Sequence, residues 1–319
     1  MRRREFVGGI VAAALPVVAR AQQSKRLAYV SWQSPTTANQ IDFFREGLRQ
    51  FGYVERQNIE LESYFTDANK ALTESTIQSL VRKKIDVLIV RVTPAAHIAK
   101  DATQAIPIVM MVADPIATGL VQSLSRPGGN LTGISLASTD AMGKKFELLR
   151  EIEPDIRTIG FLGISDIQQT GTYLRETATA GQQLGLKVVN RLVDSPNLPD
   201  ESVFASMKQE GAEAVIVQPV FSGHQDRVVE LAMKLQLPVV SDFPAFARAG
   251  ALFTFGVEEA DFVRRAAYFV DRILKGAKPA DLPVEQPTKF ELAVNVRSAK
   301  KLNIVLPPLL LSRADEVIE

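Results

Sequence analysis

The fold is decided by the stretch Ile85-Asp86-Val87-Leu88-Ile89-Val90, which leads through a helical segment to Ile106-Pro107-Ile108-Val109. About 130 residues later the same order returns, in Ala214-Val215-Ile216-Val217 followed by Leu237-Pro238-Val239-Val240. Short β-branched runs that alternate with amphipathic segments are typical of parallel strands joined by crossover helices. The sequence therefore predicts an α/β protein of two similar lobes, each a parallel sheet flanked by helices.

The other strands and helices keep this rhythm. Strands are expected at 27–31, 58–65, 85–92 and 106–112 in the first half, and at 158–163, 186–193, 214–218 and 237–241 in the second. The first helix carries apolar side chains three and four residues apart, at Ile41, Phe44, Leu48 and Phe51. Gly52 ends this helix, and Gly185 ends the matching helix of the second half.

Two regions are expected to carry the chain between the lobes. Residues 126–135 are rich in turn formers. Residues 258–275 form an amphipathic helix, and the prolines that follow it bracket an extended segment, 284–295. We expect lobe 1 to comprise residues 25–134 and about 257–284, and lobe 2 to comprise 135–256 and about 285–319. The multi-strand hinge between them would allow closure around a ligand.

The first 21 residues have the pattern of a secretory signal peptide. Arginines precede an apolar run of about 13 residues, which is too short to cross a bilayer, and Ala19-Arg20-Ala21 suits signal peptidase. Arg3-Arg4-Glu5-Phe6-Val7 is similar to the twin-arginine export pattern. We expect cleavage after Ala21 and a periplasmic protein without a membrane anchor.

The composition excludes several classes of function. The chain has 37 basic and 36 acidic residues, and removal of residues 1–21 leaves a formal charge of −2. This charge gives no basic excess for nucleic acid. There is no cysteine, so thiol catalysis and thiolate metal sites are excluded, and only His97 and His224 remain for imidazole chemistry. No phosphate-binding loop, dinucleotide fingerprint, nucleophile elbow or zinc-protease motif occurs. We expect no catalytic residue, metal or cofactor.

Ligands of open parallel sheets bind at the carboxyl ends of the strands, so the loops after the strands hold the candidate binding residues. These residues are Ser31, Trp32, Thr93, Pro94, Ala95, Asp114, Ser135, Ser165, Gln218, Phe221, Asp242 and Phe243. Most are short hydrogen-bonding side chains or aromatic rings, which suits a small polar solute.

Some candidates have a specific expected role. Thr93-Pro94 and Asp114-Pro115 have the form of a helix N-cap followed by proline, and a capped helix start can hold a ligand carboxylate. Asp242 could pair with a ligand ammonium or be a solvated loop carboxylate. Trp32 could stack on the ligand or shield a core edge. Arg91 could meet an anion in the cleft or pair with a neighbouring carboxylate.

Several longer strings carry a family resemblance. They include Thr93-Pro94-Ala95-Ala96, Arg126-Pro127-Gly128-Gly129-Asn130, Ile273-Leu274-Lys275-Gly276-Ala277-Lys278-Pro279 and Arg313-Ala314-Asp315-Glu316-Val317-Ile318. Together they resemble the ABC-transporter substrate-binding proteins of the tryptophan/tyrosine-type group, over nearly the whole mature chain. Two cleft segments depart from the usual family pattern, namely Gly163-Ile164-Ser165-Asp166-Ile167 and Arg91.

This resemblance implies a type I periplasmic binding fold and delivery of a small solute, with an amino-acid-like carboxylate as the leading candidate, to the transmembrane subunits of an ABC permease. Two rival hypotheses remain at this point. One is a two-lobed racemase or hydrolase that uses Asp114 and Asp242 as an acid/base pair. The other is a ligand-sensing module that presents the closed lobes to a signalling receptor.

Overall fold

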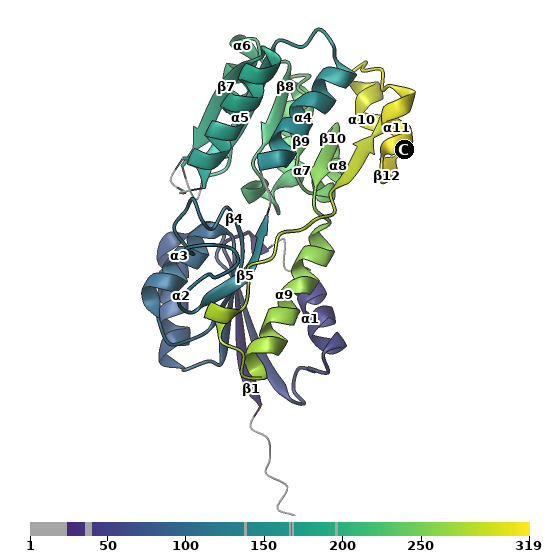
Figure 1. Cartoon of the computed structure of the whole chain (residues 1–319). Helices are drawn as coiled ribbons and strands as arrows, with labels where there is room; N and C mark the ends of the chain where they lie inside the picture. The colour runs from purple at the N-terminus through teal and green to yellow at the C-terminus, as the bar shows by residue number, and fades with distance from the viewer. Residues whose placement is uncertain (1–23, 36–39, 137–138, 166, 168, 195–196) are drawn as a thin grey trace, which may run out of the picture.

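The computed structural model describes residues 24–319 apart from 36–39, 137–138, 166, 168 and 195–196. The expected signal peptide, residues 1–21, lies outside the described residues. The chain forms two α/β lobes that are stacked end to end (Figure 1). The predicted architecture of two lobes, each a sheet with flanking helices, is therefore confirmed. Within the described part of the chain, no helix has both the length and the apolar character needed to span a bilayer.

Lobe 1 is built on a five-stranded parallel sheet of order β2-β1-β3-β4-β5. The strands are β1 (Lys25–Ser31), β2 (Ile59–Phe65), β3 (Val87–Arg91), β4 (Ile108–Ala113) and β5 (Leu131–Leu136). The helices are α1 (Gln40–Gln50), α2 (Lys70–Arg82), α3 (Thr93–Ala102) and α9 (Glu259–Leu274). Helix α9 comes from the far end of the sequence and packs along α1 (Figure 1).

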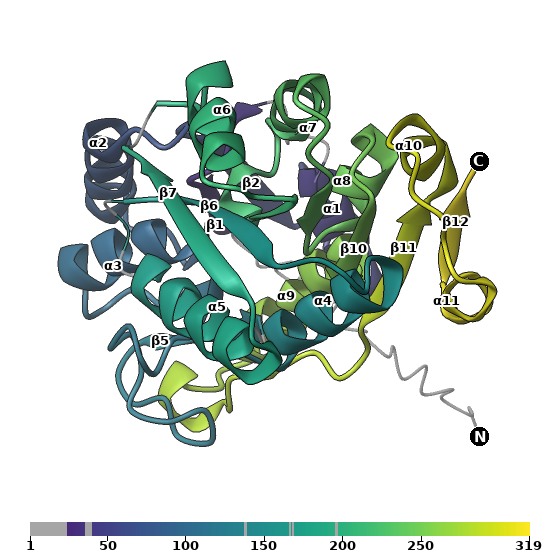
Figure 2. The same cartoon turned by 90° about the horizontal axis from the view of Figure 1, so that it is seen from above.

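Lobe 2 has a seven-stranded sheet of order β12-β11-β10-β9-β8-β6-β7, in which β10 and β11 are antiparallel. The strands are β6 (Thr158–Ile164), β7 (Lys187–Val193), β8 (Ala214–Val217), β9 (Val239–Ser241), β10 (Phe253–Gly256), β11 (Glu291–Asn295) and β12 (Glu316–Ile318). The helices are α4 (Thr139–Ile152), α5 (Thr170–Leu184), α6 (Glu201–Gln209), α7 (Gln225–Lys234), α8 (Pro244–Ala249), α10 (Val296–Lys301) and α11 (Pro308–Arg313). Figure 2 shows α4 and α5 on one face of this sheet and α6 and α7 on the other.

Successive side chains of a strand point to opposite faces of the sheet, and this decides which helices each strand residue contacts. In β3, Val87 and Ile89 belong to the apolar cluster beneath α1 and α9, whereas Leu88 and Val90 belong to the cluster beneath α2 and α3. Both faces are buried, which is why the parallel strands read as continuous apolar runs. In β3 the alternation continues to its last residue, Arg91, which is buried and lines the surface that faces the other lobe.

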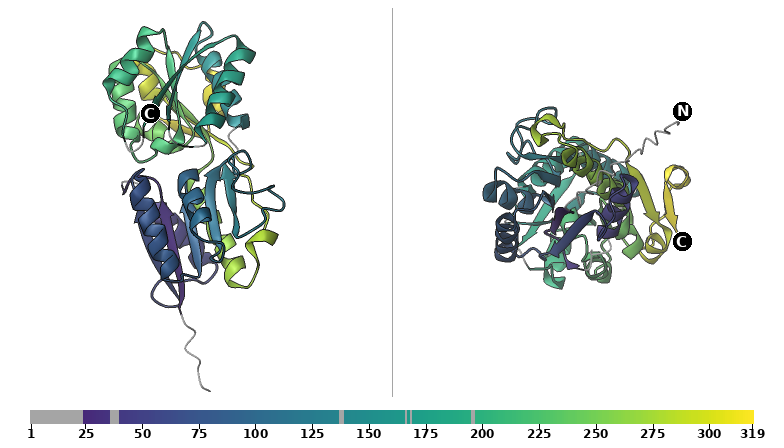
Figure 3. Two further views of the ribbon diagram at one scale, coloured as in Figure 1. Left: turned by 90° about the vertical axis from the view of Figure 1, so that its left-hand side faces the viewer. Right: turned by 90° about the horizontal axis from the view of Figure 1, so that it is seen from below.

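The lobes are joined by three crossings of the chain (Figure 3). They run from β5 to α4, from β10 to α9, and from residue 284 into β11. The first and third are hydrogen-bonded to each other, because Ser135 N donates to Glu285 O at 2.8 Å and Glu285 N donates to Gly133 O at 3.0 Å. A glycine is needed at 133, since a Cβ there would lie 2.1 Å from Met110 O. These paired crossings form the hinge.

Some local expectations were wrong. Helix α1 ends at Gln50, so Phe51 lies beyond it and is 36% exposed rather than buried against the sheet. Residues 284–295 are not one strand, because β11 begins at Glu291. The residues after Asp114 form turns rather than a helix, and the N-cap of α3 is Val92 rather than Thr93. Strands β10 and β12 were not predicted from the sequence, and neither was β5, which occupies the end of the segment 126–135 that was expected to be a turn-rich crossing.

The packing of α1 on α9 depends on Gly47. A Cβ at this position would lie 2.5 Å from Arg264 O, which is backbone and cannot move away cheaply. Gly143 in α4 is a matched control, because a Cβ there meets nothing within 4 Å. We expect Gly47→Ala to lower the free energy of unfolding by about 1–3 kcal/mol. We expect Gly143→Ala to raise it by about 0.4–1 kcal/mol. Urea unfolding followed by circular dichroism measures both changes, and equal effects of the two substitutions would contradict this assignment.

Candidate functional site

The carboxyl ends of the two sheets face each other across an interlobe cleft. One apolar cluster contains side chains of both lobes, including Val112 of β4 and Val220 after β8, so the lobes are in contact and the cleft is closed. The space left in it is about 30 Å³, enough for one or two water molecules. A larger ligand therefore requires the lobes or the lining side chains to move.

Both lobes supply the lining of this cleft. Lobe 1 contributes the ends of β1, β3, β4 and β5 together with α9, and lobe 2 contributes the start of α5 and the loops after β8 and β9. The lining residues are Gln33, Arg91, Val92, Met111, Val112, Ala113, Leu136, Gln169, Tyr173, Pro219, Val220, Phe243 and Phe262. The cleft thus has three aromatic walls, several aliphatic side chains and few polar groups, a composition typical of small-molecule sites.

In the part of the chain that the structure describes, three buried oxygens at the cleft find no hydrogen-bond donor. They are Gln33 Oε1 from lobe 1 and Gln169 Oε1 and Asp242 Oδ2 from lobe 2. The three residues are 3%, 4% and 9% exposed. A buried acceptor without a donor costs about 1–3 kcal/mol. The cleft therefore presents unused capacity to accept hydrogen bonds.

Asp242 is held at the cleft by a buried lysine. Val240 of β9 faces α4, and alternation brings Asp242 to the same face, where Lys145 Nζ donates to Asp242 Oδ1 at 2.6 Å. Lys145 is only 1% exposed. Burial, assisted by the negative charge of Asp242, raises the pKa of Tyr173 well above its usual value. Tyr173 therefore remains a neutral phenol in the cleft wall.

Arg91 continues the inward alternation of Val87 and Ile89 and lies beneath α1 and α9. Its guanidinium donates to Gln40 Oε1 at the start of α1 and to Glu259 Oε1 at the start of α9. Burial opposes the charged guanidinium, but the adjacent Glu259 carboxylate outweighs this, so the pKa of Arg91 is raised. Of the two readings left open by the sequence, the structure shows pairing with a neighbouring carboxylate.

Val92 is the single residue between Arg91, at the end of β3, and Thr93, at the start of helix α3. Its φ of 72° is in a region that β-branched residues avoid. Backbone hydrogen bonds hold it there, because Val92 N donates to Met111 O at 3.0 Å and Trp32 N donates to Arg91 O at 3.3 Å. Strain of this kind is commonly found at functional sites, and here it sets the start of α3 beside the cleft.

The structure brings only part of the predicted residue set to the cleft. Phe243 lines it, Asp242 is next to Phe243, and Asp114 follows the lining residue Ala113. Thr93 begins α3 after the lining residue Val92, but its hydroxyl donates to Ala113 O at 3.3 Å. Pro94 and Ala95 follow it in the first turn of α3.

Other predicted residues are buried in the core and do not line the cleft. Trp32 is 3% exposed in the apolar cluster beneath α2 and α3, which favours the reading in which it shields a core edge. Phe221 is also in the apolar core. The Gln218 side chain accepts from Ile164 N and contacts Thr170.

Three serines complete the set. Ser31 Oγ accepts from Gln33 N at 3.2 Å, which shapes the turn after β1. Ser135 lies in the hinge strand β5, and its hydroxyl donates to the adjacent Leu136 O. Ser165 is exposed and bonds the Asp194 carboxylate at the end of β7. These serines stabilise loops around the cleft, but they do not line it.

The sequence analysis missed four lining residues that matter chemically. Gln33 directly follows the candidate Trp32 and has a side chain of suitable type, so loop position alone could have found it. Gln169, Tyr173 and Phe262 belong to the starts of α5 and α9 rather than to loops after strands. No local signal distinguishes them, because they reach the cleft only through the docking of their helices.

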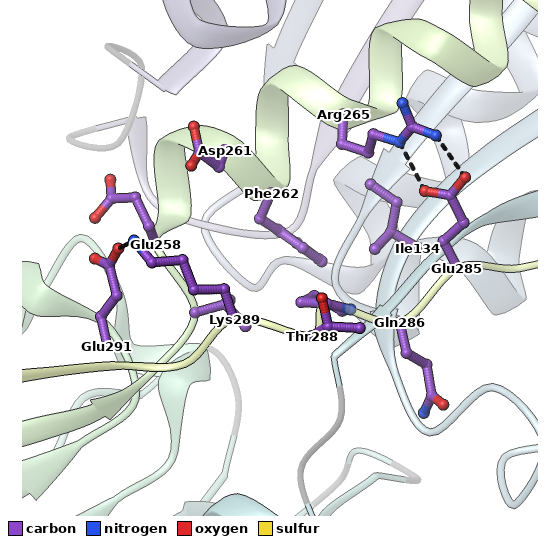
Figure 4. Close-up of a pocket in the computed structure, with 12 residues that line it drawn as sticks. Ile134, Glu258, Asp261, Phe262, Arg265, Glu285, Gln286, Thr288, Lys289 and Glu291 are labelled. Carbon is purple, nitrogen blue, oxygen red and sulfur yellow. Dashed lines mark hydrogen bonds and ion pairs between the residues drawn. The ribbon is translucent and has the colours of Figure 1, made fainter.

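A second hollow of about 300 Å³ lies outside the cleft, between α9 and the crossing segment 285–291 (Figure 4). Four of its charged groups are paired with one another, since Arg265 forms a two-pronged ion pair with Glu285 and Lys289 pairs with Glu291. Phe262 lines both this hollow and the cleft, so its ring is the partition between them. In the described part of the chain, no group of three or more metal-ligating acidic or histidine side chains occurs.

Comparison with known proteins gives a consistent result. The curated "Tyrosine-binding protein" of Clostridioides difficile (strain R20291) is 23% identical over 262 residues, which cover 82% of this chain and 75% of that protein. A conserved domain protein from Vibrio cholerae has a TM-score of 0.84 and 24% identity. The ABC domain in complex with L-Trp from Streptococcus pneumonia has a TM-score of 0.83 and 24% identity.

Each of these two structures covers 92% of this chain and 100% of its own. The predicted type I periplasmic binding fold is thereby confirmed. Residues 29–318 match the family described as ABC transporter substrate binding protein. The chain therefore belongs to the family of ABC transporter substrate-binding proteins.

Proposed function

We propose that this protein is exported, captures a small amine-bearing solute in its interlobe cleft, and presents the closed form to an ABC permease without changing the solute chemically. The observation that carries the proposal is the set of three buried acceptors, Gln33 Oε1, Gln169 Oε1 and Asp242 Oδ2. Oxygens that lack donors in the closed cleft favour a ligand that brings N–H groups, and a carboxylate favours a cationic one.

The start of α3 suits the other end of an amino-acid-like ligand. Val92 lines the cleft and α3 begins at Thr93. The first-turn amides of a helix have no partner within the helix, and its N-terminus carries a partial positive charge. Arg91 is less suited to this role because Glu259 already neutralises its charge. A carboxylate beside α3 and an ammonium beside Asp242 would bridge the two lobes.

The aromatic walls support an aromatic or apolar side chain on the ligand. Tyr173 and Phe243 approach from lobe 2, and Phe262 approaches from lobe 1. One relative is named a tyrosine-binding protein, and one protein of the same fold is described in complex with L-Trp. These names support an aromatic amino acid as the leading candidate.

Each carboxylate of the rival acid/base hypothesis accepts hydrogen bonds from other residues of the protein. Asp114 accepts from Ala117 N and Thr172 Oγ1, and Asp242 accepts from Lys145. These interactions fix loops and lobes, which supports binding rather than turnover.

The ligand class can be tested with matched pairs of compounds. L-tryptophan and indole-3-propionate differ only in the ammonium group, as do L-tyrosine and 3-(4-hydroxyphenyl)propionate. We expect each amino acid to bind at least tenfold more tightly than its deaminated partner, because a hydrogen bond to a charged group contributes about 1.5–3 kcal/mol. Calorimetric titration of the mature protein measures this ratio. Equal affinities within the pairs, or no binding across amino acids and other amines, would remove the basis of the proposal.

The role of Gln169 can be tested by replacing its amide with an apolar group of similar length. We expect Gln169→Met to weaken binding of an amine ligand about tenfold, because one acceptor is lost. It should not lower the melting temperature of the free protein, since its buried oxygen has no donor there. Gln182→Met, at an exposed position of the same helix, is the control and should leave both quantities unchanged. A parallel loss of stability and affinity in Gln169→Met would indicate a structural role.

The pair of Arg91 with Glu259 should be structural rather than a ligand site. Arg91→Met would leave the Glu259 carboxylate, whose side chain is 12% exposed, without its cation. We expect a loss of about 3–5 kcal/mol in the free energy of unfolding. Arg91→Met combined with Glu259→Gln should recover much of this loss and retain binding. Denaturant unfolding and titration of the double variant check both points; a stable double variant that no longer binds would place Arg91 in the ligand site.

A further inference from the structure

Two polar contacts cross the cleft outside the lining residues. On one side, His224 of lobe 2 lies with its Nε2 3.1 Å from Asp67 Oδ1 of lobe 1. On the other, Thr172 Oγ1 of lobe 2 donates to Asp114 Oδ2 of lobe 1 at 3.1 Å. Asp67 follows edge strand β2, whereas Asp114 follows β4, and the sheet order places β1 and β3 between them. The contacts therefore flank the cleft.

Both aspartates have a backbone conformation that aims them at the other lobe. Asp67 has φ 47° and Asp114 has φ 42°, in the left-handed region. Aspartate tolerates this region better than most residues, but the conformation still has a cost. In each case an abrupt turn at the end of a strand carries a carboxylate across the gap. The same unusual backbone conformation after β2 and after β4, on either side of β1 and β3, indicates a common role.

Each partner is bonded or adjacent to a residue that lines the cleft. Asp67 N donates to Gln33 O at 3.1 Å, and Thr172 N donates to Gln169 O at 3.0 Å. Gln33 and Gln169 carry two of the three buried side-chain oxygens that find no donor among the described residues. Asp114 directly follows Ala113, a lining residue.

The lobe 2 partners are also held in place locally. His224 N donates to Phe221 O at 2.9 Å, next to the lining residue Val220. Thr172 Oγ1 accepts a hydrogen bond from Arg175 Nη2 at 3.0 Å, which leaves its proton for Asp114. Movement of the cleft lining on ligand binding is therefore transmitted directly to both contacts.

We propose that the pairs Asp67–His224 and Asp114–Thr172 are two latches that hold the lobes closed and set the rate at which the bound solute escapes. Closure by the latches does not depend on the identity of the ligand. Only their effect on escape rests on the proposed function. Because the latches lie on separate strands and share no partner, their contributions should add.

Pulsed electron paramagnetic resonance can measure lobe closure without any ligand. The chain has no native cysteine, so Gln78→Cys on α2 and Gln209→Cys on α6 give two unique spin labels, one on each lobe. Both positions are exposed, and Figure 1 places the two helices on the same side of the molecule. We expect the labelled protein with intact latches to populate a short, closed distance.

The test variants remove one polar partner and keep its shape. Thr172→Val and His224→Phe should each lower the ratio of closed to open molecules about two- to tenfold, and the double variant should show the product of the two factors. Thr179→Val, at an exposed position of α5, and His97→Phe in α3 are controls that should leave the ratio unchanged. Asp67→Asn keeps an acceptor oxygen and tolerance of the left-handed region, so its effect should be smaller.

A second measurement separates closure from ligand binding. With L-tryptophan as the probe, stopped-flow dissociation should accelerate in the latch variants by the same factors, while association stays within about twofold. If neither L-tryptophan nor any other amino acid or amine binds, the proposed function is contradicted, but the ligand-free distances still decide the latch proposal. Unchanged distance distributions in the double variant at an unchanged melting temperature would overturn it. So would labelled protein with intact latches that shows no short distance.

Discussion

The rest of the structure depends on the burial of acceptor oxygens that have no donors. Gln33, Gln169 and Asp242 each lose hydration when the lobes close, and nothing in the described protein replaces it. The closed form therefore carries a cost of about 1–3 kcal/mol for each such group. A ligand with suitably placed donors removes this cost. The free energy of ligand binding is therefore linked to the free energy of lobe closure, because the ligand stabilises the closed form.

The hinge and the buried ion pairs limit which interactions change when the lobes open and close. Three crossings restrict the lobes to rotation about one edge, and the backbone pairing of Glu285 with residues 133 and 135 keeps two of the crossings together. Arg91 and Lys145 each anchor a carboxylate beneath one lobe's cleft surface. Because both ion pairs lie within a lobe, opening the cleft breaks neither. Opening changes the hydration of the buried oxygens of Gln33, Gln169 and Asp242. It also changes the apolar contact between the lobes and the two polar contacts that flank the cleft.

Much of the fold was predictable because buried parallel strands leave a strong local signal. The predicted bounds of β3, β4, β8 and β9 lie within two residues of the observed bounds. Short elements such as β10 and β12 were missed because four- and three-residue strands form only through their neighbours. Phe51 was wrongly predicted to belong to α1, because it continues the apolar spacing of that helix, whereas α1 ends at Gln50.

The sequence by itself determined the two-lobed α/β plan and most of its strands, whereas the region in which a ligand binds stays a prediction. The plan and the strands follow from interactions between near neighbours and from a side-chain period of two. The tertiary structure alone decided which loop residues meet in the cleft. Arg91 became a structural cation because α9 returns from the second half of the chain to bring Glu259 to it, and Gln169 and Tyr173 reached the cleft because α5 docks beside β6. The contact between Arg91 and Glu259 joins residues 168 positions apart. The geometry of all these contacts depends on how whole helices pack, which no local pattern records.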